Sequence, residues 1–102
     1  MKINPKYLIY HDLIGFHIYA KNKSKPIDSQ FADIGTVVDD SKSMLITEKN
    51  NIIKKYIKKD HIFRIDIQND EEKKILEVNG EKIVGRPENR LRNLRKKRWY
   101  KR

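Results

Sequence analysis

The feature of this 102-residue chain that most limits its fold is a succession of short apolar segments, each shorter than a typical helix. In the clearest segment, Phe63, Ile65 and Ile67 alternate with polar residues, which is the period of a half-buried strand. The apolar segments cover residues 16–20, 34–38, 44–47, 52–57, 63–67, 75–78 and 82–84. About six short strands joined by turns predict a mainly β fold in the form of a small closed antiparallel barrel.

Polar stretches between these segments contain the residues that turns need. Asp and Ser side chains at residues 39–42 hydrogen-bond nearby backbone, and residues 49–51 supply a second turn. Asn79 and Gly80 form the dipeptide best suited to a two-residue type I′ hairpin, because both central residues need a positive φ. We therefore expect residues 75–78 and 82–84 to pair across this turn. Residues 22–30 show no periodicity and are expected to form a loop.

The two ends of the chain carry helix-start signals. Asn4 is a candidate N-cap, and Pro5 follows at the first helical position, where its missing N–H costs nothing. Near the C-terminus, Pro87 can begin a helix, and Glu88 is placed favourably near the positive end of its dipole. We expect an N-terminal helix or extension at 1–14, a barrel at 15–85 and a basic C-terminal helix or tail at 86–102.

Length and composition limit the class of protein. A chain of 102 residues forms one domain with one modest core. No apolar run approaches the roughly 18 residues of a membrane-spanning helix, and residues 1–10 lack the features of a signal peptide, so we expect a cytoplasmic protein without a membrane partner. The chain has no Cys, which excludes disulfides, thiolate zinc sites and Cys nucleophiles.

Positive charge is concentrated at the C-terminal end. Residues 1–85 hold 15 Lys and Arg against 13 Asp and Glu, whereas residues 86–102 hold 9 against 1. Such a field favours a polyanion, either nucleic acid or an anionic membrane, because neutralised phosphates release condensed counterions. Aromatic rings within the run add stacking surfaces for unpaired bases, which suits RNA. The candidate RNA-binding residues of this region are Arg86, Arg90, Arg92, Arg95, Lys96, Lys97, Arg98, Trp99, Tyr100, Lys101 and Arg102.

Two plainer interpretations stay open for these charges. The C-terminal run is also compatible with a solvated tail that has no dedicated ligand. A second basic cluster comprises Lys54, Lys55, Lys58 and Lys59, and from it we add Lys58 and Lys59 to the candidate RNA contacts. An ordinary solvated strand face explains that cluster equally well.

No constellation of catalytic or metal-binding residues is evident. The histidines are not paired at the spacing of a common zinc motif, and the serines lack the context of a nucleophile elbow. The carboxylate pairs at residues 39–40 and 71–72 fall in predicted turns, where turn formation and solubility explain them. We expect no catalytic residue, no metal site and no cofactor bound by this chain. The histidines are His11, His17 and His61.

Several blocks of sequence occur in an order that resembles a known family. They are Leu13-Ile14-Gly15, the stretch from Gly35 to Leu45, Val78-Asn79-Gly80 and, most specifically, Gly85-Arg86-Pro87-Glu88-Asn89-Arg90. Together they resemble archaeal ribonuclease P protein component 1 over roughly residues 12–92. The chain departs from the family pattern at Lys58, where a proline is common, and in the turns at 49–51 and 68–70.

The resemblance implies a fold, an assembly and a set of partners. The fold would be a six-stranded Sm-like or SH3-like barrel, and the chain would be a subunit of ribonuclease P, the endonuclease that removes 5′ leaders from precursor tRNA. The catalytic RNA would carry the Mg²⁺ ions. The chain would bind the specificity region of that RNA and pair with a zinc-ribbon protein subunit, and it would not form a homo-oligomer alone. Arg86 and Arg90 match the family signature, whereas the cations after Arg92 are particular to this sequence.

Three other functions remain as alternatives at this stage. Two are binding modules, a ring-forming Sm-like RNA chaperone and a barrel-type ribosomal protein. The third is an autonomous nuclease. Oligomeric state separates the ring former from a ribonuclease P subunit, and metal-dependent cleavage by the isolated chain separates the nuclease.

Overall fold

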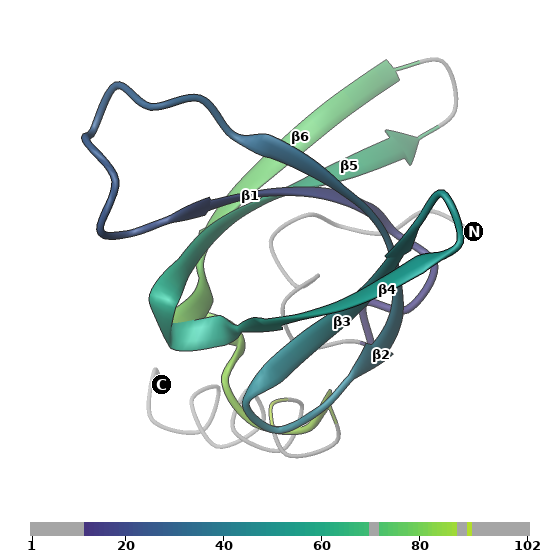
Figure 1. Ribbon diagram of the computed structural model, residues 1–102. Coiled ribbons are helices and arrows are strands. Elements are labelled where there is room, and N and C mark those ends of the chain that lie inside the picture. Colours follow the sequence, from purple (N-terminus) through teal and green to yellow (C-terminus); the bar gives the residue numbers. More distant parts are fainter. Residues whose placement is uncertain (1–11, 70–71, 88–89, 91–102) are drawn as a thin grey trace, which may run out of the picture.

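The computed structural model describes residues 12–69, 72–87 and 90. Six strands form one antiparallel sheet with the order β4-β3-β2-β1-β5-β6 (Figure 1). The mainly β, barrel-like fold predicted from the sequence is confirmed, and the predicted strands correspond to observed ones except at residues 82–84. The strands are β1 (His17–Asn22), β2 (Ala32–Asp40), β3 (Met44–Lys49), β4 (Ile52–Ile57), β5 (His61–Asn69) and β6 (Glu72–Asn79).

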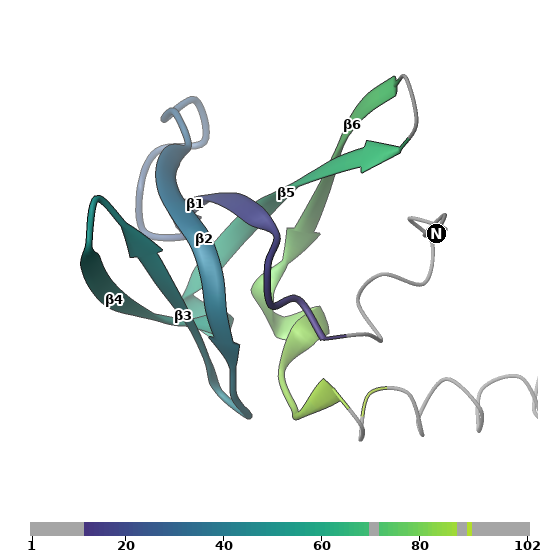
Figure 2. The same ribbon diagram turned by 90° about the vertical axis from the view of Figure 1, so that its right-hand side faces the viewer.

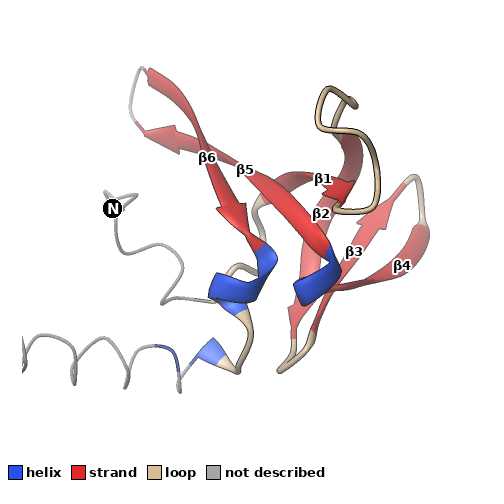
Figure 3. Cartoon of the chain, turned by 90° about the vertical axis from the view of Figure 1, so that its left-hand side faces the viewer, coloured by secondary structure: helices blue, strands red, loops and turns tan. Residues whose placement is uncertain are grey.

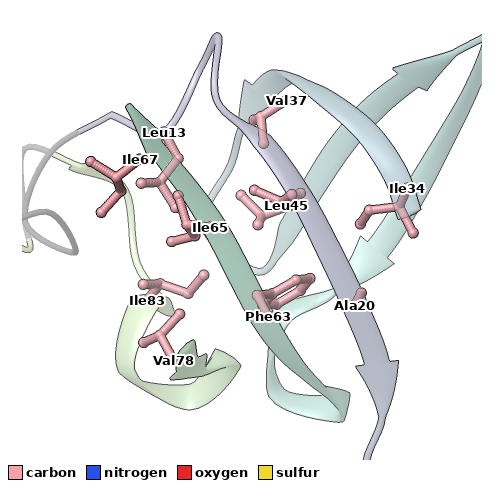
Figure 4. Packing of buried hydrophobic residues seen from close by; sticks show 11 residues of the cluster. Leu13, Ala20, Ile34, Val37, Leu45, Phe63, Ile65, Ile67, Val78 and Ile83 are labelled. Carbon is pink, nitrogen blue, oxygen red and sulfur yellow. The ribbon is translucent and has the colours of Figure 1, made fainter. Parts of the chain in front are cut away.

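The sheet bends around a single core. Turning the molecule by 90° shows β2, β3 and β4 on one side and β5 with β6 on the other, with the β5–β6 hairpin reaching beyond the rest of the sheet (Figure 2). The alternation expected for β5 is confirmed, because Phe63, Ile65 and Ile67 are all buried. Figure 4 shows these side chains meeting those of the facing strands. The buried core comprises Leu13, Ile18, Ala20, Ile34, Val37, Leu45, Phe63, Ile65, Ile67, Val78 and Ile83.

Two short 3-10 helices close one end of the barrel. The first, η2 (Lys58–Asp60), turns the chain from β4 into β5, and the second, η3 (Gly80–Ile83), follows β6. Figure 3 shows them side by side. A Cβ atom at Gly80 would lie 1.6 Å from the backbone oxygen of Lys58, so only glycine permits this approach. The two helices therefore pack backbone against backbone.

The predicted hairpin at Asn79 and Gly80 is wrong. Asn79 ends β6 and its side chain accepts a hydrogen bond from the backbone N–H of Glu81 at 3.0 Å, which starts η3 instead of a turn. The predicted partner strand at 82–84 is replaced by η3, which buries Ile83 in the core. The left-handed two-residue turn lies between β3 and β4, where Asn50 and Asn51 have φ values of 53° and 66°.

The ends of the barrel extend past the expected limits at residues 15 and 85. Leu13 is fully buried in the core, and Arg90 is buried at the other end of the described chain. Pro87 and Arg90 have helical backbone, and the Arg90 N–H donates to the Arg86 carbonyl at 3.1 Å, as in one α-helical turn. The N-terminal helix predicted from Asn4 and Pro5, and the remainder of the C-terminal helix, lie outside the described residues.

Candidate RNA-binding surface

A buried carboxylate, Asp40, organises the closed end of the barrel. Its Oδ1 accepts a hydrogen bond from Lys58 Nζ at 2.7 Å, and its Oδ2 accepts one from Arg90 Nη2 at 2.8 Å. Arg90 Nη1 also donates to Oδ1 at 3.3 Å, and the Leu13 backbone N–H donates to Oδ2 at 3.3 Å. Four segments that are distant in sequence therefore meet at one carboxylate. We call Asp40, Lys58 and Arg90 the buried ion cluster.

The cluster contains two cations and one anion, and backbone carbonyls solvate the excess positive charge. Arg90 Nη1 donates to the Ile83 carbonyl at 3.1 Å and to the Gly85 carbonyl at 2.6 Å. Lys58 Nζ donates to the Gly85 carbonyl at 3.2 Å and to the Ser41 carbonyl. Among the described residues, no buried side-chain nitrogen or oxygen lacks a hydrogen-bond partner. A buried charge costs little only when it is satisfied in this way.

Burial has a direct effect on the ionisation of Lys58. Removal from water lowers the pKa of Lys58 below its usual value, and the hydrogen bond and charge of Asp40 oppose that change. The positive charge of Arg90 acts in the same direction as burial. Lys58 is thus held by its partners against an environment that disfavours its charge.

A bulge in β2 explains why an aspartate points into the barrel. The register between β2 and β3 shifts between Val37 and Asp39, so one extra residue is inserted at this point. As a result, Val37 and Asp40 are both buried, whereas Asp39 between them is exposed. The prediction that the carboxylates of residues 39 and 40 lie in a solvated turn is wrong for Asp40, which is buried. A bulge carries no clear sequence signal here, so the alternation of apolar residues could not reveal it.

Two predicted RNA contacts take a structural role instead. The Lys58 side chain has 0% of its surface exposed and Arg90 has 3%, and both cationic groups already bind Asp40. A phosphate cannot reach either group in this conformation. Lys58 of the second basic cluster and Arg90 of the Gly85–Arg90 signature therefore hold the barrel end together, and their burial contradicts the prediction that they contact RNA directly.

Exposed cations gather around the buried ion cluster. Lys42 is exposed in the β2–β3 turn, and its carbonyl accepts a hydrogen bond from the Gly85 N–H at 2.6 Å, which places exposed Arg86 next to it. Lys59 and Lys82 are exposed on η2 and η3, which pack together. We call Lys42, Lys59, Lys82 and Arg86 the basic end. Lys59 and Arg86 are among the RNA contacts predicted from the sequence, whereas Lys42 and Lys82 are not, because their proximity depends on the packing of the turn and η3.

The other predicted RNA-binding residues follow Arg90 in the chain. Residues 91–102 follow Arg90 directly in the sequence. The prediction that they contact RNA concerns residues outside the described structure. These residues are Arg92, Arg95, Lys96, Lys97, Arg98, Trp99, Tyr100, Lys101 and Arg102.

A hollow on the outer face of the sheet is a weaker candidate for binding phosphate. It has a volume of about 430 Å³ and is lined mainly by Tyr19, Phe31, Arg64 and Ile75. The guanidinium carbon of Arg64 lies 3.9 Å from the centre of the Phe31 ring, and Arg64 also pairs with Glu77 at 2.9 Å. Its one arginine is thus already neutralised, whereas the cations of the basic end are exposed.

The described residues contain no group of three or more His, Asp or Glu side chains placed to hold a metal ion. They also contain no helix that is long and apolar enough to cross a membrane.

A small β barrel that gathers exposed cations at one end belongs to the class of nucleic-acid-binding barrels. Within that class, the sequence matches the family described as ribonuclease P/MRP, subunit p29, over residues 6–93. The chain belongs to this family, which confirms the resemblance found in the sequence.

Known relatives agree with the family assignment. The chain is 35% identical to ribonuclease P protein component 1 of Pyrococcus furiosus over 100 residues, which is 98% of this chain and 72% of that protein. It is 30% identical to the protein of the same name from Methanosarcina mazei, covering 98% of this chain and 96% of the relative. The family and these relatives support a ribonuclease P subunit that works with RNA and other subunits, in preference to an Sm-like chaperone or a ribosomal protein.

Proposed function

We propose that this chain is an RNA-binding subunit of ribonuclease P that helps the catalytic RNA remove 5′ leaders from precursor tRNA. The observation that carries the proposal is the basic end, four exposed cations fixed around the buried ion cluster, and the cationic sequence of residues 91–102 adds to its charge. A surface of this kind binds the phosphate backbone and fixes its orientation, because each neutralised phosphate releases counterions.

In this proposal the chain positions RNA and the RNA performs the chemistry. Mg²⁺ ions bound by the RNA would stabilise the charges that develop during phosphodiester hydrolysis. The contribution of this chain is preorganisation: the ion cluster holds the β2–β3 turn, η2 and the Gly85–Arg90 segment in one arrangement before RNA arrives. No residue of this chain acts on the scissile bond, and the chain needs no cofactor of its own.

We further propose the partners and the compartment. The basic end and the tail bind the specificity region of ribonuclease P RNA, precursor tRNA is the substrate of the assembled enzyme, and a zinc-ribbon subunit is the protein partner. The isolated chain is monomeric and acts in the cytoplasm. The family assignment and the concentration of positive charge at the C-terminal end support these proposals.

The test compares two variants that lose the same charge from different surfaces. The first replaces Lys42, Lys59, Lys82 and Arg86 with Gln, and the control replaces exposed Lys25, Lys49, Lys54 and Lys55 with Gln. Binding to ribonuclease P RNA is measured from low to high salt. We expect the first variant to lose affinity and to show a shallower salt dependence, by somewhat under one unit of slope for each lost phosphate contact. Equal losses in the two variants would show that net charge, and not the basic end, binds the RNA.

A second experiment tests the assisting role. With the zinc-ribbon subunit present, the wild-type chain should lower the Mg²⁺ concentration that the RNA needs to process precursor tRNA. Deleting residues 93–102 should weaken this effect and flatten the salt dependence of RNA binding. Failure of the full chain to bind or assist the RNA would refute the proposed function.

A further inference from the structure

β4 is an edge strand whose apolar side chains face solvent. In the described sheet it pairs only with β3 (Figure 2). Ile52, Ile53 and Ile57 are 58%, 62% and 43% exposed, and every residue of the strand except partly buried Tyr56 is exposed. A long edge with exposed isoleucines promotes pairing with another strand, and proteins normally cover or interrupt such edges.

The backbone of β4 has a defined set of outward-pointing groups. The Lys58 N–H donates to the Ser43 carbonyl at 2.9 Å, and the two-residue turn joins Lys49 directly to Ile52. In an antiparallel ladder hydrogen-bonded pairs alternate with non-bonded pairs, so the even-numbered residues of β4 bond to β3. The N–H and C=O groups of Ile53 and Lys55 therefore point away from the sheet, as does the N–H of Ile57. The Ile57 carbonyl accepts from His61 Nδ1 at 2.8 Å.

The pairing of β4 with β3 also shows which side chains of β4 lie on each face of the sheet. Leu45 and Thr47 of β3 are buried, so their partners Tyr56 and Lys54 lie on the inner face of the sheet. Ile53, Lys55 and Ile57 then lie on the outer face. On the inner side, Ile52, Lys54 and Tyr56 border a hollow of about 210 Å³ that leaves room for an additional strand's side chains.

Charge indicates the composition of the occupant. The centre of β4 is formed by Lys54 and Lys55, which lie on opposite faces of the sheet. An apolar pair, Ile52 and Ile53, precedes them, and Tyr56 and Ile57 follow. The strand contains no acidic residue. An antiparallel strand laid along this edge meets two apolar residues, then two lysines, then two apolar residues. Cross-strand pairs of opposite charge and apolar pairs both stabilise such an arrangement.

We propose that the β4 edge accepts an extended segment of a partner protein in which two acidic residues are flanked on both sides by apolar residues. Backbone hydrogen bonds at Ile53 and Lys55 supply the attachment, and the two lysines select the register and the sign of charge. A second copy of this chain is disfavoured, because pairing β4 with itself places its lysines together without a compensating acid. The inference does not depend on RNA binding.

The test uses a synthetic peptide with the central sequence Val-Val-Glu-Glu-Val-Val and the full-length chain. We expect amide signals of β4 to shift when the peptide is added in NMR titrations, with intermolecular contacts to Ile53 and Ile57. A peptide with Lys-Lys in place of Glu-Glu is the matched control, and it should bind at least tenfold more weakly. The charge-reversed chain K54E/K55E should reverse this preference.

Lys55→Pro tests attachment through the backbone. Its N–H points away from β3, so proline removes the outward donor without removing a bond of the native sheet, and edge strands tolerate proline at such positions. Unchanged urea unfolding would confirm that the variant folds, and at least tenfold weaker peptide binding is expected. If Lys55→Pro does not fold, an ester bond in place of the peptide bond that carries this N–H makes the same test.

Three results would overturn the inference. The first is the absence of peptide binding to the wild-type chain, or equal binding of both peptides. The second is self-association of the wild-type chain that Lys55→Pro abolishes, which would identify a second copy as the occupant. The third is a loss of RNA affinity in the K54Q/K55Q chain as large as that caused by removing the basic end. None of these outcomes would by itself refute the proposed ribonuclease P function.

Discussion

The closed end of the barrel and the β4 edge invert the usual distribution of residues. At the closed end, the charges of Asp40, Lys58 and Arg90 are buried and paired. At the β4 edge, isoleucines are exposed. The two regions are joined directly, since Lys58 follows the last residue of β4. The difference shows that burial in this small fold depends on where segments meet: four segments meet at Asp40, whereas among the described strands β4 pairs with β3 alone.

The two regions also differ in how far their polar groups are satisfied within the chain. Every polar atom of the buried ion cluster has a partner within the chain. Within the described residues, the β4 edge leaves outward backbone groups without a strand partner, and it has apolar side chains that a partner could cover. Substitutions should therefore destabilise the isolated protein at the closed end and leave its stability almost unchanged at the edge.

The largest effect is expected for Asp40→Ala. The substitution leaves Lys58 and Arg90 buried without their anion, which should lower the free energy of unfolding by about 3–5 kcal/mol. Urea unfolding measures this loss. Asp39→Ala is the matched control, because Asp39 is exposed one residue away and its removal should change stability by less than about 0.5 kcal/mol. Similar losses in both variants would contradict the organising role of Asp40.

Gly80→Ala should have the next largest effect. The new Cβ would overlap the backbone oxygen of Lys58, so η2 and η3 must move apart. We expect a loss of about 1–3 kcal/mol, as for other overpacked sites. Lys82→Ala in the same short helix is exposed and should cost less than about 0.5 kcal/mol in thermal or urea unfolding.

Lys58→Met should lower the free energy of unfolding by about 1–2 kcal/mol, which is less than the loss expected for Asp40→Ala. Asp40 keeps its ion pair with Arg90 in this variant, whereas the Ser41 and Gly85 carbonyls each lose a hydrogen-bond donor. The loss should depend on pH. Since the pKa of Lys58 is lower in the folded than in the unfolded chain, the unfolded chain binds more protons between the two values. The contribution of Lys58 therefore grows as pH rises through that window.

Urea unfolding of the wild-type and Lys58→Met chains from about pH 8 to about pH 10 measures this trend as an increasing difference between them. Burial raises the pKa of Tyr56, which reduces stability at high pH, but this contribution is common to both chains and cancels. A difference that shrinks with pH would show that the attraction of Asp40 outweighs burial at Lys58.

The smallest effect is expected for Ile53→Thr. Its side chain is 62% exposed and threonine has a strong β propensity, so the free energy of unfolding should change by less than about 0.5 kcal/mol. Ile65→Ala in the core provides the contrast, with an expected loss of about 2–5 kcal/mol. A large loss at Ile53 would mean that the edge is covered within the chain itself.

Much of the fold follows from local patterns in the sequence. The alternation in β5 and the turns near Ser41 and Asn50 correctly predicted the strands around them, because these signals involve residues that are close in the chain. The prediction failed at Asn79-Gly80. There, an Asn side chain that caps η3 and a close approach to Lys58 decide the structure, and neither is encoded in the dipeptide.

The candidate site was only partly predictable for the same reason. Lys58 and Lys59 are identical neighbours in sequence, yet one is buried against Asp40 and the other is exposed at the basic end. A bulge in β2 sets this difference by turning Asp40 inward. The identity of the family came from ordered sequence blocks, whereas the division between structural and exposed cations required the three-dimensional arrangement.

The buried ion cluster also has a consequence for the order of events during synthesis. Its partners come from residues 13, 40, 58 and 90, so the last of them leaves the ribosome long after the strands that hold the others. Because chains emerge from the N-terminus and elongate at about 5–20 residues per second, the barrel end stays open for several seconds after β4 is made. A truncated chain that lacks Arg90 leaves the Asp40 site without its second cation. The basic end can thus take its final arrangement only after nearly all of the described length has been translated, which makes its assembly one of the last steps in the folding of the described residues.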